Sequence, residues 1–333
     1  MAGAPLHIAP DVARALSAGA PVVALETAVV THGLPRAPLA HVPPCMRADG
    51  AFAHAGWNAA APANAALAHA VAQVVRAAGA VPATVGMLHG TLLVGMTPAQ
   101  VDELAAAPSP RKLSARDLGP AAAQQASGGT TVAGTLAACG LAGIRVFATG
   151  GIGGVHRAWS TLPDISADMA ALARTPCAVV SAGAKAILDL PATVEALDTL
   201  GIPVLGVGTA HFPRFTAPGD AALRTSALVE DALHAAQACA LHWAFCPQVG
   251  ALVALPPPAE YALSAPELEA AVQSAERAAS LQGVAGQQLT PFLLDHLASS
   301  TGGRSVDANI AVLAANARFA AALAQALSKN PTR

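Results

Sequence analysis

The chain of 333 residues has few charges and few aromatic rings. Charged residues make up 11% of it and aromatic residues 3%, whereas 54% are hydrophobic. Because it has no cluster of Lys and Arg and no mixture of basic and aromatic residues, we expect no nucleic-acid-binding surface. With so few rings, the core must be built from small aliphatic side chains that pack at close range.

Cysteine is also scarce, and its pattern excludes two kinds of site. No Cys-x-x-Cys pair occurs, and the number of cysteines is odd. An odd and scattered set predicts a reducing compartment, no disulfide framework and no zinc site. The cysteines are Cys45, Cys139, Cys177, Cys239 and Cys246.

Two long windows without charge raise the question of a membrane span. Residues 50–75 and 232–259 contain no Asp, Glu, Lys or Arg, but His, Asn, Gln and Pro interrupt both windows. Such residues are costly in hydrocarbon, so we expect no membrane span. The N-terminal segment lacks the basic start of a secretory signal, which predicts a cytoplasmic protein.

Several common catalytic motifs are absent. Because GxxxxGK[ST], GxSxG and HExxH do not occur, we expect no P-loop, no hydrolase nucleophile elbow and no zinc-protease helix. Residues 151–156, GIGGVH, begin like the dinucleotide-binding GxGxxG but end in His156. We therefore expect no dinucleotide site there.

Apolar runs alternate with helical patterns throughout the chain. This alternation predicts one α/β domain with a mostly parallel central sheet over residues 1–330. Residues 37–61 are rich in Pro, Ala and His without a clear period, so we expect an irregular excursion there. Strands are predicted at 21–30, 146–148, 178–180 and 251–255, a hairpin at 82–94, and helices at 97–106, 223–238 and 305–327.

Two ionisable residues lie in or beside apolar runs. Glu26 falls in the middle of residues 21–30, where a carboxylate is costly unless it has a partner or a function. Lys185 follows residues 178–180 among small apolar neighbours, an environment that suits a nucleophilic or imine-forming lysine. The alternatives are a core Glu in an ion pair and a lysine that extends from a surface helix.

A polar loop lies between the strands predicted at 146–148 and 178–180. Asp164 and Asp168 flank Ser166, and two close carboxylates suit a hard cation such as Mg²⁺ or Mn²⁺. Alternatively, Ser166 or Asp168 is the N-cap of a helix over 167–174, and both interpretations can hold. Earlier in the chain, the Gly, Ser and Thr residues of 127–131 precede a helical pattern and could hold a phosphate at the helix start.

At this point the sequence resembles a known family, the pseudouridine-5′-phosphate glycosidases, also described as indigoidine synthase A-like proteins. The resemblance follows the chain in order and covers most of it. It is carried by ALETAVVTHGLP (24–35), AVPATVGMLHGTLLVGMT (80–97), KLSARDL (112–118), SGGTTVAGTL (127–136), VFATGGIGGVHR (146–157), DISADM (164–169), RTPCAVVSAGAKAILDL (174–190) and TPFLLDHLASSTGGRSVDANIAVLAANA (290–317).

The resemblance implies a three-layer α/β/α fold with a mixed, mostly parallel sheet. It also implies a homotrimer that uses one Mn²⁺ per subunit and reversibly splits pseudouridine 5′-phosphate into uracil and ribose 5-phosphate. In this family pattern Lys185 is the covalent nucleophile, Glu26 the proton donor and Asp164 the metal ligand. The implied substrate contacts are Lys112, Val132, Ser166, Ala167 and Asp168, with Thr149 and His156 toward the uracil and Asn309 at the border of the site.

Two other functions remain compatible with these residues. One is a different Schiff-base lyase or aldolase that acts on a sugar phosphate with the same Lys185 and metal. The other is a non-catalytic paralogue that binds a ligand without turnover. The intact pair of Glu26 and Lys185 argues against the second alternative.

Overall fold

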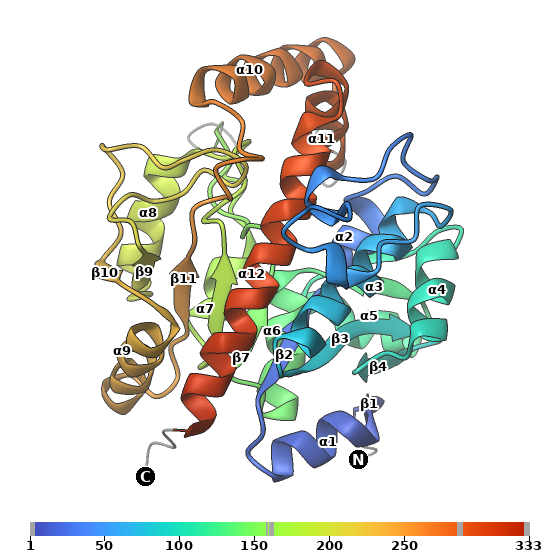
Figure 1. Ribbon diagram of the computed structural model, residues 1–333, viewed down its shortest axis with the longest axis vertical. Coiled ribbons are helices and arrows are strands. Elements are labelled where there is room, and N and C mark those ends of the chain that lie inside the picture. The colour runs from blue at the N-terminus through green and yellow to red at the C-terminus, as the bar shows by residue number, and fades with distance from the viewer. Residues whose placement is uncertain (1–3, 158, 160–162, 285–288, 330–333) are drawn as a thin grey trace.

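The computed structural model describes residues 4–157, 159, 163–284 and 289–329. Within these residues, eleven strands form one sheet with the order β1-β4-β3-β2-β7-β8-β11-β9-β10, and β6 joins it by pairing with β3 and β5 (Figure 1). Every pair is parallel except β3 with β4 and β3 with β6. The strands are β1 Leu6–Ile8, β2 Val22–Leu25, β3 Val81–Leu88, β4 Thr91–Val94, β5 Arg111–Leu113, β6 Gly128–Thr130, β7 Val146–Ala148, β8 Ala178–Ser181, β9 Val204–Val207, β10 Ala227–Val229 and β11 Ala251–Ala254.

Helices cover both faces of this sheet (Figure 1). The α-helices are α1 Pro10–Ser17, α2 Ala28–His32, α3 Ala63–Ala77, α4 Pro98–Ala106, α5 Leu118–Ala123, α6 Val132–Ala142, α7 Ala167–Leu172, α8 Leu190–Thr199, α9 Ala232–Phe245, α10 Ala265–Gln282, α11 Leu289–Ser300 and α12 Arg304–Lys329. Residues 37–61 contain only two short 3-10 helices, η1 Pro44–Met46 and η2 Ala53–Ala55, and a third, η3 Ala115–Asp117, precedes α5.

The alternation of side chains along each strand explains the three layers. In β7, Phe147 points into a core beneath α1, α6, α7 and α8, whereas Val146 and Ala148 point into a second core beneath α3, α9 and α12. The side chains of the neighbouring strands alternate between the two cores in the same way, because successive strand residues face opposite sides of a sheet. The predicted three-layer α/β/α class with a mostly parallel mixed sheet is confirmed.

Helix α12 is the one helix in the described residues that is long and apolar enough to cross a membrane. It runs across the face of the sheet (Figure 1), and 61% of its most apolar window is buried inside the fold. Its apolar side, which includes Ile310, Leu313 and Leu323, packs into the second core. Core packing therefore accounts for the composition of this helix.

Two predicted elements are wrong in their bounds. The apolar run at 21–30 is not one strand, because β2 ends at Leu25 and α2 begins at Ala28. Thr27 breaks the run: its hydroxyl donates to the carbonyl of Val85 at 2.6 Å and accepts from the amide of Thr130 at 3.1 Å. Residues 223–238 are likewise not one helix, because β10 comes first and the Asp231 side chain caps α9.

Candidate active site

The carboxyl edge of the sheet brings together three residues that lie far apart in sequence. Glu26 directly follows β2, Thr149 directly follows β7, and Lys185 lies four residues beyond the end of β8. Strands β2, β7 and β8 are adjacent and parallel, so their carboxyl ends lie at the same edge. Ligands bind at this edge in open α/β sheets.

Two adjoining cavities open at this edge. The larger, here called the wide lobe, has a volume of about 500 Å³, which is within the range for small-ligand pockets. The smaller, here called the narrow lobe, has a volume of about 60 Å³. Both are lined by Glu26, Ala28, Lys112, Lys185 and Thr290, so the two lobes share a wall that carries both candidate catalytic groups.

All eleven site residues predicted from the sequence line one lobe or both. Thr149 and Asn309 line the narrow lobe. The wide lobe alone takes the six others: Val132, His156, Asp164, Ser166, Ala167 and Asp168. Thr149 and His156, which the family resemblance places together toward one base, therefore face different lobes.

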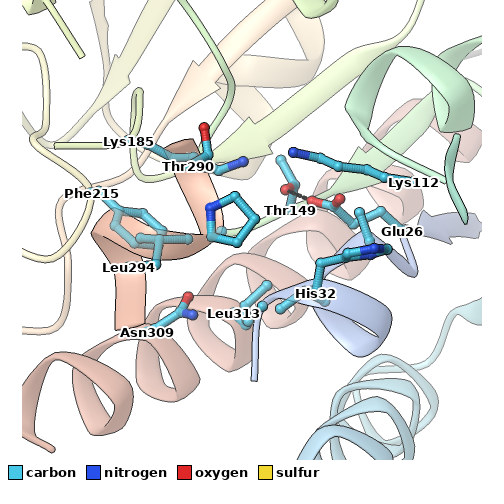
Figure 2. Close-up of a pocket in the computed structure, with 16 residues that line it drawn as sticks. Glu26, His32, Lys112, Thr149, Lys185, Phe215, Thr290, Leu294, Asn309 and Leu313 are labelled. Atoms are coloured by element: carbon cyan, nitrogen blue, oxygen red, sulfur yellow. Dashed lines mark hydrogen bonds between the residues drawn. The ribbon is translucent and has the colours of Figure 1, made fainter. Parts of the chain in front are cut away.

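Glu26 is held by a hydrogen bond from the neighbouring strand end. The hydroxyl of Thr149 donates a hydrogen bond to Oε1 of Glu26 (Figure 2). Burial raises the pKa of Glu26 above its ordinary value, although Lys185 and the Thr149 hydrogen bond both act to lower it. A carboxyl group whose pKa is raised by burial can carry a proton toward neutral pH, which suits a general acid.

Two lysines approach this carboxyl group. In Figure 2, the amino groups of Lys112, from β5, and Lys185 point toward one another across the cavity, beside Glu26 and Thr149. Burial lowers the pKa of Lys112, and the positive charge of Lys185 lowers it further. The cavity wall thus combines a carboxyl acid with two amines.

The backbone of the Lys185 segment is built into the glycine-rich loop that follows β7. The Lys185 amide donates to the Ile152 carbonyl at 3.1 Å, and the Ile152 amide donates to the Gly183 carbonyl at 3.0 Å. These bonds continue the β7–β8 pairing beyond the strands, since Ile152 and Ala184 form a parallel bridge. The glycine-rich loop therefore holds the backbone of Lys185 in place.

Asp168 links the start of helix α6 to the glycine-rich loop, beside the wide lobe. The residue is only 6% exposed, and its carboxylate accepts from the amide of Ala133 at 2.9 Å and from the amide of Gly153 at 2.8 Å. A side chain on Gly153 would lie 2.3 Å from the Ser166 hydroxyl, so only glycine permits this approach. Ser166 is the N-cap of α7, as one interpretation of the sequence predicted.

The start of helix α6 has fewer free amides for a phosphate than the sequence suggested. The amide of Ala133 is bonded to Asp168, and the amide of Gly134 is bonded to the Thr131 hydroxyl at 3.3 Å. Among the described residues no acceptor bonds the amide of Val132, which lines the wide lobe. The glycines before this helix serve packing instead, because a side chain on Gly129 would lie 2.3 Å from the Thr31 hydroxyl.

Asp164 is the carboxylate that is open to the wide lobe. Its side chain is 44% exposed, and one oxygen lies 3.8 Å from Nε2 of His156. Burial lowers the pKa of His156, whereas the charge of Asp164 raises it. No group of three His, Cys, Asp or Glu side chains that could hold a metal occurs in the described parts of the chain. The residues thus fit a largely hydrated hard cation on one carboxylate rather than a cation enclosed by protein ligands.

Three residues of the site were missed by the sequence analysis. His32 lines the narrow lobe, and burial and the charge of Lys112 lower its pKa. Phe215 also lines it, in a left-handed backbone conformation (φ 63°) that is rare for a bulky residue. Asn316 of α12 lies behind the site and donates from Nδ2 to the Thr149 carbonyl at 2.7 Å and to the Gly150 carbonyl at 3.3 Å. The sequence does carry one signal for Asn316, because it is a polar residue within an Ala-rich, apolar helical pattern.

The fold and the site together define an α/β enzyme with a cavity at the carboxyl edge of its sheet, lined by a glutamate and two lysines. The family model described as "Indigoidine synthase A like protein" matches residues 56–326. The chain belongs to this family. Pseudouridine-5′-phosphate glycosidase of Chloroflexus aurantiacus is 43% identical over 328 residues, which cover 97% of this chain and 99% of that protein. The enzyme of the same name from Methylobacterium nodulans is 45% identical, with coverage of 97% and 88%.

Two solved structures share the fold. The prealnumycin C-glycosynthase AlnA, in complex with ribulose 5-phosphate, has a TM-score of 0.82 and 33% identity, and the match covers 98% of each chain. An indigoidine synthase A-like protein from Thermotoga maritima has a TM-score of 0.80 and 28% identity, and the match covers 97% of this chain and 96% of that one. The predicted family is thereby confirmed by sequence and by fold.

Proposed function

We propose that this chain reversibly cleaves the C-glycosidic bond of pseudouridine 5′-phosphate, giving uracil and ribose 5-phosphate. The observation that most directly supports this proposal is that Glu26 and Lys185 lie on the wall shared by both lobes. A substrate that spans the two lobes would place its scissile bond at this wall. The activity in the names of the relatives agrees with this arrangement.

The two lobes suit the two halves of the substrate. Lys112, Arg116 and the Val132 amide offer the wide lobe the positive charge and the donor that a sugar phosphate requires. Ser166, Ala167 and Asp168 supply the opposite wall. The narrow lobe, lined by Phe215, Leu294 and Leu313, suits a flat base, with Thr149 and Asn309 as its polar contacts. His156 would face the base from the side of the wide lobe.

In the proposed reaction Glu26 gives its proton to the ribose ring oxygen as the bond from C1′ to that oxygen breaks. Nζ of Lys185 forms a bond to C1′ and loses a proton, which returns to the Glu26 carboxylate. The reprotonated Glu26 then gives its proton to C5 of uracil while the C1′–C5 bond breaks toward the base, and the nitrogen lone pair forms the C=N bond. Water adds to this imine, restores the amine and releases ribose 5-phosphate.

We also propose that Asp164 holds Mn²⁺, that the chain forms a homotrimer and that it works in the cytoplasm. The exposed carboxylate of Asp164 beside the wide lobe supports the first point. When bound, the ion supplies positive charge that neutralises the substrate phosphate. The family resemblance supports the other two points, and sedimentation velocity of the purified chain tests the trimer.

The lysine content of the chain makes the covalent step easy to test. Lys112, Lys185 and Lys329 are its three lysines. Borohydride reduction in the presence of ribose 5-phosphate should label Lys185, as seen by peptide mapping, and Lys329 is the internal control. Wild type and Lys329→Ala should release uracil with Mn²⁺, and Lys185→Ala should not. Sugar-phosphate cleavage without uracil release would favour an aldolase, and binding without any turnover would favour a non-catalytic paralogue.

A further inference from the structure

Arg157 links helix α10 to the segment that follows Lys185. Its guanidinium bonds both oxygens of Glu269, with Nη1–Oε1 at 3.1 Å and Nη2–Oε2 at 3.2 Å, and its Nε lies 3.3 Å from Oε1 of Glu276. The same guanidinium donates to the carbonyls of Ala186 at 3.3 Å and Leu188 at 3.4 Å. One side chain therefore holds two carboxylates and two backbone carbonyls.

These carbonyls belong to the turn that carries the candidate nucleophile. Ala186 directly follows Lys185, and the Leu188 amide donates to the Lys185 carbonyl at 3.1 Å, which closes the turn. Upstream, the Lys185 amide is fixed by Ile152. The Lys185 segment is thus held from one side by the glycine-rich loop and from the other by Arg157.

The geometry at Arg157 is of a kind that lysine cannot reproduce. Only a planar guanidinium presents enough N–H donors, in a fixed fork, to bind a carboxylate through two atoms and still reach carbonyls. The hydrogen bond from Arg157 is the main cause that lowers the pKa of Glu269. The Arg157 side chain is 31% exposed, and partly exposed ion pairs add little to global stability. Its loss should therefore alter local geometry more than folding.

We propose that Arg157, anchored by Glu269 and Glu276 of α10, is a positioning residue that orients Lys185 for imine formation. Arg157 does not line either lobe and acts only through the backbone that follows the lysine. The inference rests on the proposed function for the role of Lys185. It adds an indirect link from α10, which lies outside the cavity, through Arg157 to the backbone segment that carries the reacting amine.

The test measures imine formation separately from uracil release. The rate of borohydride-trapped adduct with ribose 5-phosphate is measured for wild type, Arg157→Ala, Arg157→Lys and Glu269→Gln. We expect the saturating rate to fall about 10-fold to 100-fold in both Arg157 variants, because small displacements of a reacting group have effects of this size. The concentration of ribose 5-phosphate that gives half the maximal rate should stay within about twofold, because Lys112 and the Val132 amide are untouched.

Glu269→Gln should show a smaller loss in the same direction, and its combination with Arg157→Ala should add nothing further, because both changes break one link. Guanidinium ions should partly restore the rate of Arg157→Ala, whereas ammonium ions at equal ionic strength should not. Arg174→Ala is the matched control, since Arg174 is an exposed arginine whose side chain donates only to the nearby Ala170 carbonyl among described contacts.

The outcomes separate this inference from the proposed function. Uracil release by the wild-type chain tests the proposed function alone. Normal trapping rates in folded Arg157→Lys and Glu269→Gln would overturn the positioning role, whatever the outcome with uracil. An equal loss in Arg174→Ala would also overturn it, because the effect would then not be specific to the link with α10.

Discussion

Asn316 offers a prediction whose size can be worked out from its contacts. The residue is 1% exposed in the middle of α12, and replacement by Leu keeps the number and branching of its side-chain heavy atoms while removing its donors. The Gly150 carbonyl keeps a second donor, the Ala182 amide at 2.8 Å. The Thr149 carbonyl has no other donor among the described residues, so it would be left buried and unpaired. Such a group costs about 1–3 kcal/mol, and we expect Asn316→Leu to lose about 2 kcal/mol of stability.

The assay is urea denaturation followed by far-ultraviolet circular dichroism. The matched control is Asn58→Leu, because Asn58 is exposed and its side chain accepts only from the nearby Ala60 amide, at 3.1 Å, among described contacts. Surface changes of this kind alter stability by about 0.5 kcal/mol or less. Turnover by folded Asn316→Leu should also fall about tenfold or more, because the turn that carries Thr149 and aligns Glu26 would move. Equal unfolding free energies for the two variants would refute the reasoning.

Two further predictions concern the carboxyl groups. The folded-state pKa of Glu26 lies above its ordinary value of 4.5, so the unfolded chain releases this proton first and the group weakens folding as pH rises above 4.5. Glu26→Gln should therefore have a higher melting temperature than wild type at neutral pH and an equal one below pH 4.5, despite losing turnover; a constant difference across pH would contradict this. After treatment with EDTA, Asp164→Asn should need an Mn²⁺ concentration about tenfold or more above that of wild type to recover uracil release. Asp198→Asn, on the exposed side of α8, should match wild type.

The sequence predicted the strands and caps best where the information is local. The helix predicted at 97–106 begins with a full capping box between Thr97 and Gln100, and the Ser264 side chain caps α10. The hairpin over 82–94 turns at His89 and Gly90, both with positive φ. These features depend on neighbouring residues, so their pattern can be interpreted without the rest of the fold.

Features that depend on distant partners were predicted wrongly or missed. An apolar run cannot reveal that Thr27 bonds Val85 and Thr130, so Glu26 was placed inside a strand rather than at its end. For the same reason, the pattern predicts one helix over residues 223–238, although Ala227–Val229 pairs with β9. The site residues themselves were found through long family motifs, whereas His32, Phe215 and Asn316 act through contacts that no local pattern shows.

The position of Asn316 has a consequence for how the protein is made. The turn that presents Thr149 to Glu26 gains its hydrogen-bond donor from a helix synthesised more than one hundred residues later. While the ribosome is still translating the middle of the chain, the strands β2, β7 and β8 can already exist, but the groups at their ends lack this support. We therefore expect nascent chains that stop before α12 to be inactive.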